Sequence, residues 1–199
     1  CDPLTWDPAR QYDRGKVLNA DDLDRIEKFG RYLDVDKDGI TYRTLPGTHP
    51  SKGSFFTRGT SRDEYARYTE EGAAYVRNME RLLRKWNTAK TLVPAPQFYN
   101  DPDGAEVGML FFGTTTDSAL EAIDKLREQG IHMDGMRLKA APFPQSVIDY
   151  ILDHETIYVV EQNRDGQMRS ILINELEIDP RRLVAVLNFD GFPITADNI

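Results

Sequence analysis

The residues with the greatest potential for binding chemistry in this sequence lie in one stretch, residues 41–60, where glycines alternate with basic side chains and hydroxyls. A guanidinium binds a carboxylate or a phosphate through two parallel hydrogen bonds, and an ammonium adds a compact charge. Glycine lets the backbone itself approach a ligand. The stretch therefore predicts contact with an anionic ligand or a partner protein through Arg43, His49, Lys52 and Arg58. The alternative is an ordered loop that docks on a partner without binding a ligand.

The charge around this stretch is unusual for the chain. Residues 51–90 contain nine Lys or Arg and five Asp or Glu, a local net charge of +4, whereas the whole sequence carries −8. A local basic band predicts an anionic ligand or an acidic protein face as partner. The alternative is a solvated helix stabilised by pairs such as Glu80 and Arg84.

A second pattern, Asp34-Val35-Asp36-Lys37-Asp38-Gly39-Ile40, opens like a calcium-binding loop, in which alternate carboxylates converge on one cation. The twelfth position, which should supply a bidentate Glu, is Leu45, and no second loop is present. We therefore expect a tight turn in which Asp side chains accept backbone hydrogen bonds, with at most weak calcium affinity.

Two polar groups follow predicted strands, at the edge where open α/β sheets place ligands. Thr114 and Thr115 precede a predicted helix, so they could hold an anion with its N-terminal N–H groups, or simply cap it. Glu161 and Asn163 follow a later strand and could line a site or hold two subunits in register. These four residues are the candidates at the end of the sheet.

Known catalytic and cofactor patterns are absent from the sequence. It contains no Gly-x-Ser-x-Gly elbow, no Walker loop and no Gly-x-Gly-x-x-Gly fingerprint. The one cysteine is Cys1, and the three histidines are too scattered to form a His-x-x-x-His pair. We therefore predict no catalytic residue, no metal ligand and no resident cofactor in this chain.

Composition narrows the class of protein. Hydrophobic residues make up 40% and charged residues 29% of the 199 positions, as in soluble globular domains. The acidic net charge disfavours nucleic acid and anionic membranes, and no apolar run approaches the roughly 18 residues that a membrane span needs. A single cysteine fits a cytoplasmic location. Because the chain begins with Cys rather than Met, we expect a processed product or a piece of a longer protein.

The predicted elements divide the chain at a proline-rich linker near residue 92. After it, strands alternate with helices, which predicts an α/β fold with a mainly parallel sheet and helices on both faces. The strands are expected at 107–113, 136–139, 156–160 and 183–187. The first helix is expected to follow Thr116 or Asp117 as its N-cap and to stop at Gly130, and the others are expected after Phe143-Pro144 and at 168–176. Before the linker we expect a helical, loop-rich arm, with helices at 20–32 and 73–90.

The amino-acid sequence of several segments resembles the α subunit of the 2-oxoacid:ferredoxin oxidoreductases, most closely the 2-oxoglutarate type. The segments are Asp34–Pro50, Phe56–Thr60, Tyr75–Lys85, Gly113–Thr115 and Val160–Gln167. The resemblance implies that residues 1–91 are the tail of a pyrimidine-type domain plus a connecting arm. It implies that residues 92–199 are a transketolase C-terminal-like α/β domain.

The same resemblance implies a function for the whole complex. These enzymes use thiamine diphosphate with magnesium and an iron–sulfur cluster to convert a 2-oxoacid and coenzyme A into an acyl-CoA, passing electrons to ferredoxin. The β subunit would hold the diphosphate motif and the cluster cysteines, which this sequence lacks. The chain alone is therefore expected to be inactive and to serve assembly. The alternatives are a free-standing α/β module that binds CoA or a nucleotide, and a calcium-dependent interaction domain.

Overall fold

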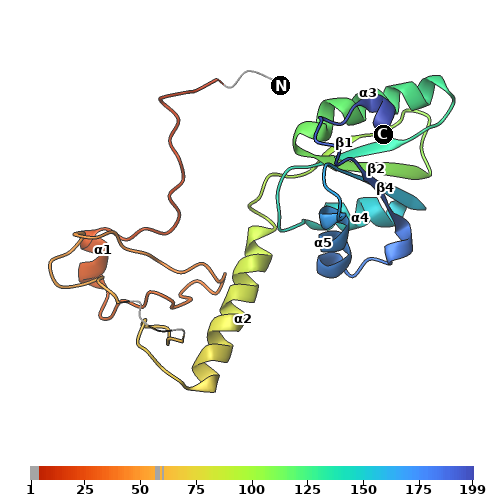
Figure 1. Cartoon of the computed structure of the whole chain (residues 1–199). Helices are drawn as coiled ribbons and strands as arrows, with labels where there is room; N and C mark the ends of the chain where they lie inside the picture. The colour runs from red at the N-terminus through yellow and green to blue at the C-terminus, as the bar shows by residue number, and fades with distance from the viewer. Residues whose placement is uncertain (1–4, 57–58, 60) are drawn as a thin grey trace. The chain divides into compact units, whose positions relative to one another are not determined.

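The computed structural model describes residues 5–56, 59 and 61–199. The chain divides into two compact units, an N-terminal unit that ends at Leu92 and a C-terminal unit that spans Val93–Ile199 (Figure 1). No helix in the described residues is long and apolar enough to cross a membrane.

The C-terminal unit is built on a five-stranded sheet with the order β1-β3-β2-β4-β5. The four strands β2 to β5 pair in parallel, and the short strand β1 adds to β3 in antiparallel orientation. The strands are β1 (Gln97–Tyr99), β2 (Val107–Phe112), β3 (Asp134–Leu138), β4 (Thr156–Glu161) and β5 (Leu183–Leu187). The mainly parallel sheet is confirmed, and β1 is an addition that the sequence pattern did not predict.

Helices cover both faces of this sheet, as predicted, because the central strands are apolar on both sides (Figure 1). Leu110 of β2 points to the face covered by α4 and α5, whereas Met109 and Phe111 point to the face covered by α3. The alternation places successive side chains of one strand in two separate cores. The helices are α3 (Thr116–Glu128), α4 (Gln145–Asp153) and α5 (Gln167–Leu176).

The start of α3 differs from its prediction. The N-cap is Thr115, whose side chain makes no capping hydrogen bond, and Thr116 already lies inside the helix. The Thr116 hydroxyl donates to the carbonyl of Gly113 at 2.8 Å instead. A 3₁₀ turn, η1 (Gly113–Thr115), precedes the helix and replaces the side-chain cap that the sequence predicted.

The N-terminal unit contains two helices, α1 (Ala20–Arg25) and α2 (Gly72–Ala89), joined by irregular chain. The predicted helix over 20–32 is wrong beyond Arg25, because Ile26 adopts an extended conformation. The ammonium of Lys52 donates to the carbonyls of Leu23, Asp24 and Ile26 at 3.1–3.3 Å. These bonds satisfy the helix end from a distant loop, so helix termination is decided by a tertiary contact.

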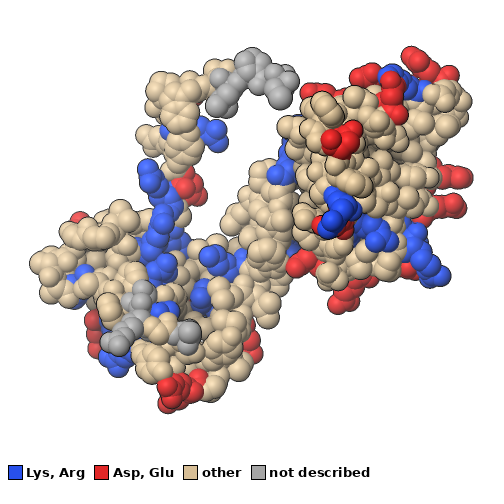
Figure 2. All heavy atoms as spheres, viewed as in Figure 1, with Lys and Arg blue, Asp and Glu red and all other residues tan. Residues whose placement is uncertain are grey.

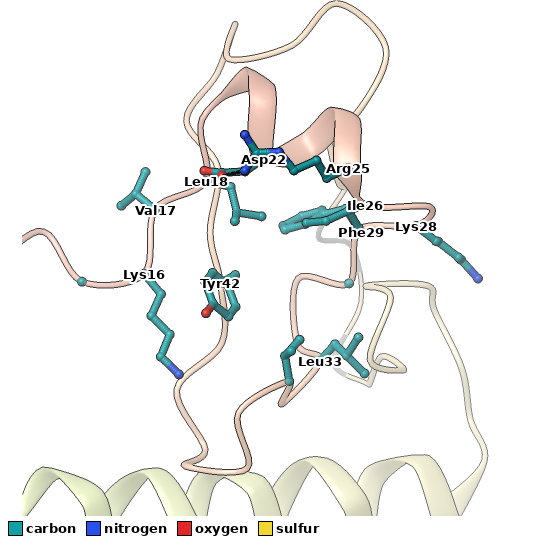
Figure 3. Close-up of a pocket in the computed structure, with 13 residues that line it drawn as sticks. Lys16, Val17, Leu18, Asp22, Arg25, Ile26, Lys28, Phe29, Leu33 and Tyr42 are labelled. Atoms are coloured by element: carbon teal, nitrogen blue, oxygen red, sulfur yellow. Dashed lines mark ion pairs between the residues drawn. The ribbon is translucent and has the colours of Figure 1, made fainter.

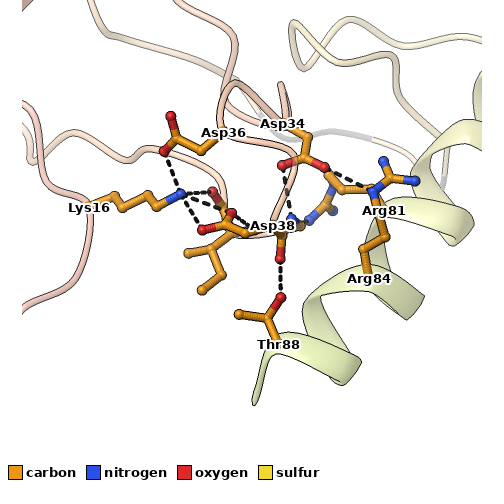
Figure 4. Close-up of polar contacts among 9 residues, drawn as sticks. Lys16, Asp34, Asp36, Asp38, Arg81, Arg84 and Thr88 are labelled. Atoms are coloured by element: carbon orange, nitrogen blue, oxygen red, sulfur yellow. Dashed lines mark hydrogen bonds and ion pairs between the residues drawn. The ribbon is translucent and has the colours of Figure 1, made fainter. Parts of the chain in front are cut away.

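Residues 34–39 form the tight turn that the sequence predicted, and a lysine takes the place of a metal ion (Figure 4). The Lys16 ammonium contacts Asp36 at 2.6 Å and both carboxylate oxygens of Asp38 at 2.7 and 2.9 Å. It also donates to the carbonyl of Ile40 at 3.1 Å. These hydrogen bonds lower the pKa of Asp36 and of Asp38.

The same turn fastens α2 to the N-terminal unit (Figure 4). Arg81 donates to the carbonyl of Gly39 at 3.1 Å, Thr88 donates to the carbonyl of Asp38 at 2.6 Å, and Arg84 pairs with Asp34 at 3.0 Å. Gly39 has φ +79°, and a Cβ there would overlap the backbone nitrogen of Lys85 and lie 2.7 Å from the Arg81 carbonyl. Only glycine fits at this crossing, because both the conformation and the space exclude a side chain.

We predict that Gly39→Ala destabilises the N-terminal unit by about 3 kcal/mol or more, because the added methyl meets helix backbone that cannot move aside. Both tryptophans, Trp6 and Trp86, lie in this unit, so urea unfolding followed by tryptophan fluorescence reports on it alone. Gly47→Ala is the matched control, since Gly47 has φ +80° but open space around it. The control should lose only about 1–2 kcal/mol; equal losses in both variants would contradict the close approach.

Candidate functional site

The carboxyl edge of the sheet contains a buried carboxylate, Glu161, at the end of β4. Its side chain is fully buried and accepts hydrogen bonds from the backbone N–H groups of Met168 and Arg169 at 2.7 and 2.9 Å. The Asn163 side chain donates a third, at 2.8 Å. The N-terminus of α5 therefore already holds an anion that belongs to the protein.

Asn163 shapes the turn that leads into α5. Its side-chain oxygen accepts hydrogen bonds from the backbone of Asp165 and Gln167 at 3.1 and 3.3 Å, while its amide nitrogen serves Glu161. Gly166 then begins the helix in a left-handed conformation, with φ +58°. Glu161 and Asn163 are thus brought together, as their positions suggested, and their polar groups stabilise the helix start.

Thr114 and Thr115 are joined to the same edge by a residue that sequence reasoning passed over. Gln162 donates to the Thr115 hydroxyl at 3.1 Å and to the Thr114 hydroxyl at 3.3 Å. Its side-chain oxygen accepts the backbone N–H of Ile194 at 3.3 Å, which ties the C-terminal segment to the sheet. The only signal for this role was the position of Gln162 directly after a buried strand.

This edge does not fit the diphosphate of a thiamine cofactor. A phosphate would have to share the start of α5 with the Glu161 carboxylate, and two like charges there repel each other in a buried setting. No catalytic step through the cofactor is therefore assigned to these residues. Their geometry supports a structural role at the sheet edge.

In the basic loop, the predicted contact residues have different surroundings. Arg43 is exposed, and its guanidinium donates to the carbonyl of Arg14 at 2.7 Å. Lys52 is committed to the end of α1, as described above. Arg58 lies outside the described residues.

His49 holds the loop against α1. Its Nδ1 accepts hydrogen bonds from the backbone of Ser51 and Lys52 at 3.1 and 2.8 Å, which places the proton on Nε2. Nε2 lies 3.1 Å from a carboxylate oxygen of Asp24. The structure thus brings His49 and Lys52 together at α1, while Arg43 lies next to residues 14–18.

A cavity of about 530 Å³ lies beside α1 in the N-terminal unit (Figure 3). Its walls are mainly apolar, and Lys16, Arg25 and Lys28 lie among the lining residues. Lys16 is held by the turn at 34–39, and the Lys28 ammonium lies 3.8 Å over the ring of Tyr65. The cavity is large enough for an apolar group of ligand size. Its apolar lining residues include Val17, Leu18, Ile26, Phe29 and Leu33.

One cluster in the described residues has the spacing of a metal site, namely Asp101, Asp103 and His132. Asp101 accepts hydrogen bonds from the Asp103 backbone at 2.9 Å, from Arg127 at 3.0 Å and from His132 at 3.0 Å. These partners, the backbone N–H first, lower the pKa of Asp101 to about 2. The cluster is organised as an ion-pair network, because the Arg127 guanidinium already neutralises the buried carboxylate.

Helix α2 packs its polar side against the rest of the N-terminal unit and exposes its apolar side, the reverse of the usual arrangement in a surface helix. Its polar residues Asn78, Arg81 and Thr88 contact the rest of the N-terminal unit, and Arg81 is buried. Its large apolar residues, at helical spacing on the other side, are 37–65% exposed. An exposed apolar face of this size is typical of a protein interface. The face consists of Tyr75, Val76, Met79, Leu82, Leu83 and Trp86.

The two units also differ in charge (Figure 2). The C-terminal unit has 8 Lys or Arg against 18 Asp or Glu, a net charge of −10, so residues 1–92 carry +2 of the total of −8. In the view of Figure 2, basic side chains gather over the N-terminal unit and acidic ones spread over the C-terminal unit. The apolar face of α2 therefore lies in the basic part of the sequence.

Comparison with known proteins finds a similar domain for most of the C-terminal unit. The model of the pyruvate:ferredoxin oxidoreductase core domain II matches residues 105–198, just under half of the chain. The matched residues are called the core domain II below, after the domain that they resemble. They comprise strands β2 to β5 with α3, α4 and α5, the elements that carry Glu161 and its partners.

The curated relatives extend over the core domain II and most of the N-terminal unit. The α subunits of 2-oxoacid:ferredoxin oxidoreductases 2 and 1 from Aeropyrum pernix are 28% and 29% identical over 180 and 193 residues. These matches cover 88% and 94% of this chain. The chain spans only 26% and 28% of the length of these two relatives. The predicted resemblance to a C-terminal portion of such an α subunit is confirmed.

A solved structure gives the same fold. The 2-oxoglutarate:ferredoxin oxidoreductase from Magnetococcus marinus, with 2-oxoglutarate, coenzyme A and succinyl-CoA bound, matches with a TM-score of 0.75. The match has 22% identity and covers 87% of this chain and 30% of that chain. At this identity the match establishes the fold, including that of the core domain II.

We predict that Glu161→Ala lowers the free energy of unfolding of the core domain II by about 3 kcal/mol. The change leaves two helix N–H groups and the Asn163 amide without their buried acceptor. Amide exchange in β4, measured by mass spectrometry, should accelerate about 100-fold. Glu175→Ala, an exposed glutamate on α5, is the control and should leave the exchange unchanged. An equal, small effect of both changes would show that the buried carboxylate is dispensable.

Proposed function

We propose that this chain acts as the C-terminal part of the α subunit of a thiamine-diphosphate-dependent 2-oxoacid:ferredoxin oxidoreductase, with 2-oxoglutarate as the substrate. In this role it holds subunits together and shapes one side of the active site, and alone it is inactive. The apolar face of α2 is the observation that carries the proposal, because a helix fastened by its polar side presents its apolar side to a partner.

The partner proposed for this face is the β subunit of the same enzyme. Fully burying an exposed large apolar side chain contributes roughly 1.5–3 kcal/mol, and these side chains, which are 37–65% exposed, gain about half of that in an interface. Six such residues on one helix face supply the apolar centre of an interface, and the surrounding basic band favours an acidic rim on the partner. The relatives that support this assignment are α subunits of this enzyme class.

In the complete enzyme, thiamine diphosphate with Mg²⁺ would supply the decarboxylation chemistry from other parts of the complex. The 2-oxoacid loses CO₂, its acyl group passes to the CoA thiol, and the two electrons released leave through an iron–sulfur cluster to ferredoxin. The contribution of this chain is binding and positioning, and the proposed location is cytoplasmic. The expected partners are the β subunit, ferredoxin, the 2-oxoacid and CoA.

Within this function, the basic loop is proposed to contact the 2-oxoacid carboxylate, the CoA phosphates or the β subunit. Arg43 is the best placed of the three candidates that the structure describes, because it is exposed and its guanidinium is held by one hydrogen bond, to the carbonyl of Arg14. His49 and Lys52 act by fixing the loop against α1. Arg58 is included from the sequence pattern.

The alternative of a free-standing module that binds CoA or a nucleotide is less well supported. A nucleotide phosphate would be expected at the carboxyl edge of the sheet, near the start of α5. The Glu161 carboxylate takes the hydrogen bonds of that helix start. The observed geometry therefore favours assembly over nucleotide binding.

We predict that Leu83→Asp prevents assembly with the β subunit, because it places a charge in the centre of the proposed interface. Leu83 is 65% exposed, so the change should leave the N-terminal unit folded. Co-expressed subunits are analysed by size-exclusion chromatography with light scattering. Ala73→Asp, at the favourable N-terminal end of the same helix and off the apolar face, should still assemble. Normal assembly of the Leu83→Asp variant would refute the proposed interface.

We predict that Arg43→Ala raises KM for the 2-oxoacid or for CoA in the assembled enzyme by about 5–100-fold, as expected for one lost charge-assisted hydrogen bond. Steady-state kinetics with both substrates varied would measure this. Arg67→Ala, which removes an exposed arginine outside the basic loop's predicted contacts, is the control. Unchanged constants in an intact assembly would leave Arg43 as a structural residue.

A further inference from the structure

Three buried polar atoms in the described residues lack a hydrogen-bond partner, and all three belong to residues that line one pocket. They are Nε of Arg62, Nε of Arg81 and Oδ1 of Asn78. The pocket has a volume of about 270 Å³ and lies in the N-terminal unit. Buried polar groups are nearly always satisfied in native proteins, so a cluster of three exceptions points to a missing partner.

The charges of this pocket are also unbalanced. Arg81 is 92% buried, and no carboxylate in the described residues pairs with it. Asp34 is the acidic residue with the largest electrostatic effect on Arg81. Its carboxylate oxygens already accept hydrogen bonds from Arg84 at 3.0 Å and from the Gly39 N–H at 2.9 Å. Burial accordingly lowers the pKa of Arg81. A buried guanidinium without a countercharge is costly, and an anion bound beside it removes that cost.

The pocket residues are held in place by the rest of the unit. Asn78 donates from its side chain to the Arg62 carbonyl at 2.7 Å, which fixes the orientation of the amide and turns its oxygen away from that bond. Arg81 lies one turn further along α2 and is fixed by its bond to Gly39. Arg62 donates from its terminal nitrogen to the Gly59 carbonyl at 2.8 Å. The site is therefore built in advance of any ligand.

We propose that this pocket is a binding site for a phosphate group, free or as a phosphate monoester, which goes beyond the function proposed above. The two guanidiniums supply donors for the anionic oxygens. The Asn78 oxygen needs a donor. Inorganic phosphate carries a P–OH proton near neutral pH, and a phosphate monoester carries one in its monoanionic form, below its second pKa of about 6, whereas a carboxylate or sulfate carries none. Tyr32, Tyr75, Met79 and Leu82 complete the lining and suit an organic group attached to the phosphate. Since the last three also belong to the apolar face of α2, the proposed site is one of the chain before it assembles with the β subunit.

The test is the stability of the full 199-residue chain with inorganic phosphate at constant ionic strength, balanced with chloride. Tryptophan fluorescence reports on the N-terminal unit alone, because it contains both tryptophans. We expect the unfolding midpoint to rise with the logarithm of the phosphate concentration above its Kd, by roughly 6–11 °C at ten times Kd. Sulfate should give a smaller rise, and acetate none.

Two variants with matched controls locate the effect. Arg62→Gln should abolish the phosphate response, whereas Arg67→Gln, at an exposed position, should retain it. Asn78→Asp replaces the unpartnered amide oxygen with a carboxylate, which repels a phosphate, so it should remove the response to phosphate. Asn87→Asp adds the same charge at an exposed position of α2 and should retain the response.

The same measurement distinguishes the two sources of phosphate. Tighter binding of phenyl phosphate than of inorganic phosphate identifies an ester whose organic group contacts the aromatic lining; equal binding identifies the free ion. The proposal is overturned if phosphate does not raise the unfolding midpoint of wild type, if Arg62→Gln responds like wild type, or if sulfate stabilises as much as phosphate. None of these outcomes depends on assembly with a β subunit, so the site and the oxidoreductase role fail separately.

Discussion

The attachment of α2 by its polar side is the constraint on which the N-terminal unit depends. The turn of residues 34–39 meets the helix at Gly39, where no side chain fits, and Arg81, Arg84 and Thr88 bond to the turn. The apolar side of α2 must then point away from this contact. The same attachment buries Arg81, and no carboxylate in the part of the chain that the structure describes pairs with it. The proposed interface and the proposed phosphate pocket therefore both follow from the way in which α2 packs against the turn of residues 34–39.

In the core domain II, by contrast, the buried polar groups form their hydrogen bonds and ion pairs within the fold. Glu161 supplies the anion for the start of α5, Gln162 ties the C-terminal segment to the sheet, and Arg127 balances buried Asp101. These contacts engage the described polar groups at the sheet edge within the domain itself. Such an edge suits the proposed role in assembly within a larger oxidoreductase.

Much of the C-terminal fold was predictable because its signals are local. Val107–Phe112 is apolar at every position, which requires cover on both faces, and the alternation of strands and helices implies parallel pairing. The three-residue strand β1 was missed because its pairing depends on β3, far along the chain. Helix α1 was predicted too long for a similar reason, since Lys52 ends it from a loop 26 residues beyond Ile26.

The sequence by itself determined the family resemblance, the parallel sheet, the local basic band and the tight turn at Asp34–Asp38. It also indicated which residues at the sheet edge would meet, because strand ends meet at one edge. Only the tertiary structure decided what these polar groups do: Lys16 occupies the turn that resembles a calcium loop, and Glu161 serves its own helix. Tertiary structure alone also placed Arg62, Asn78 and Arg81 around one pocket. The reason is that residue type fixes which bonds a side chain can make, whereas packing fixes which partners are within reach.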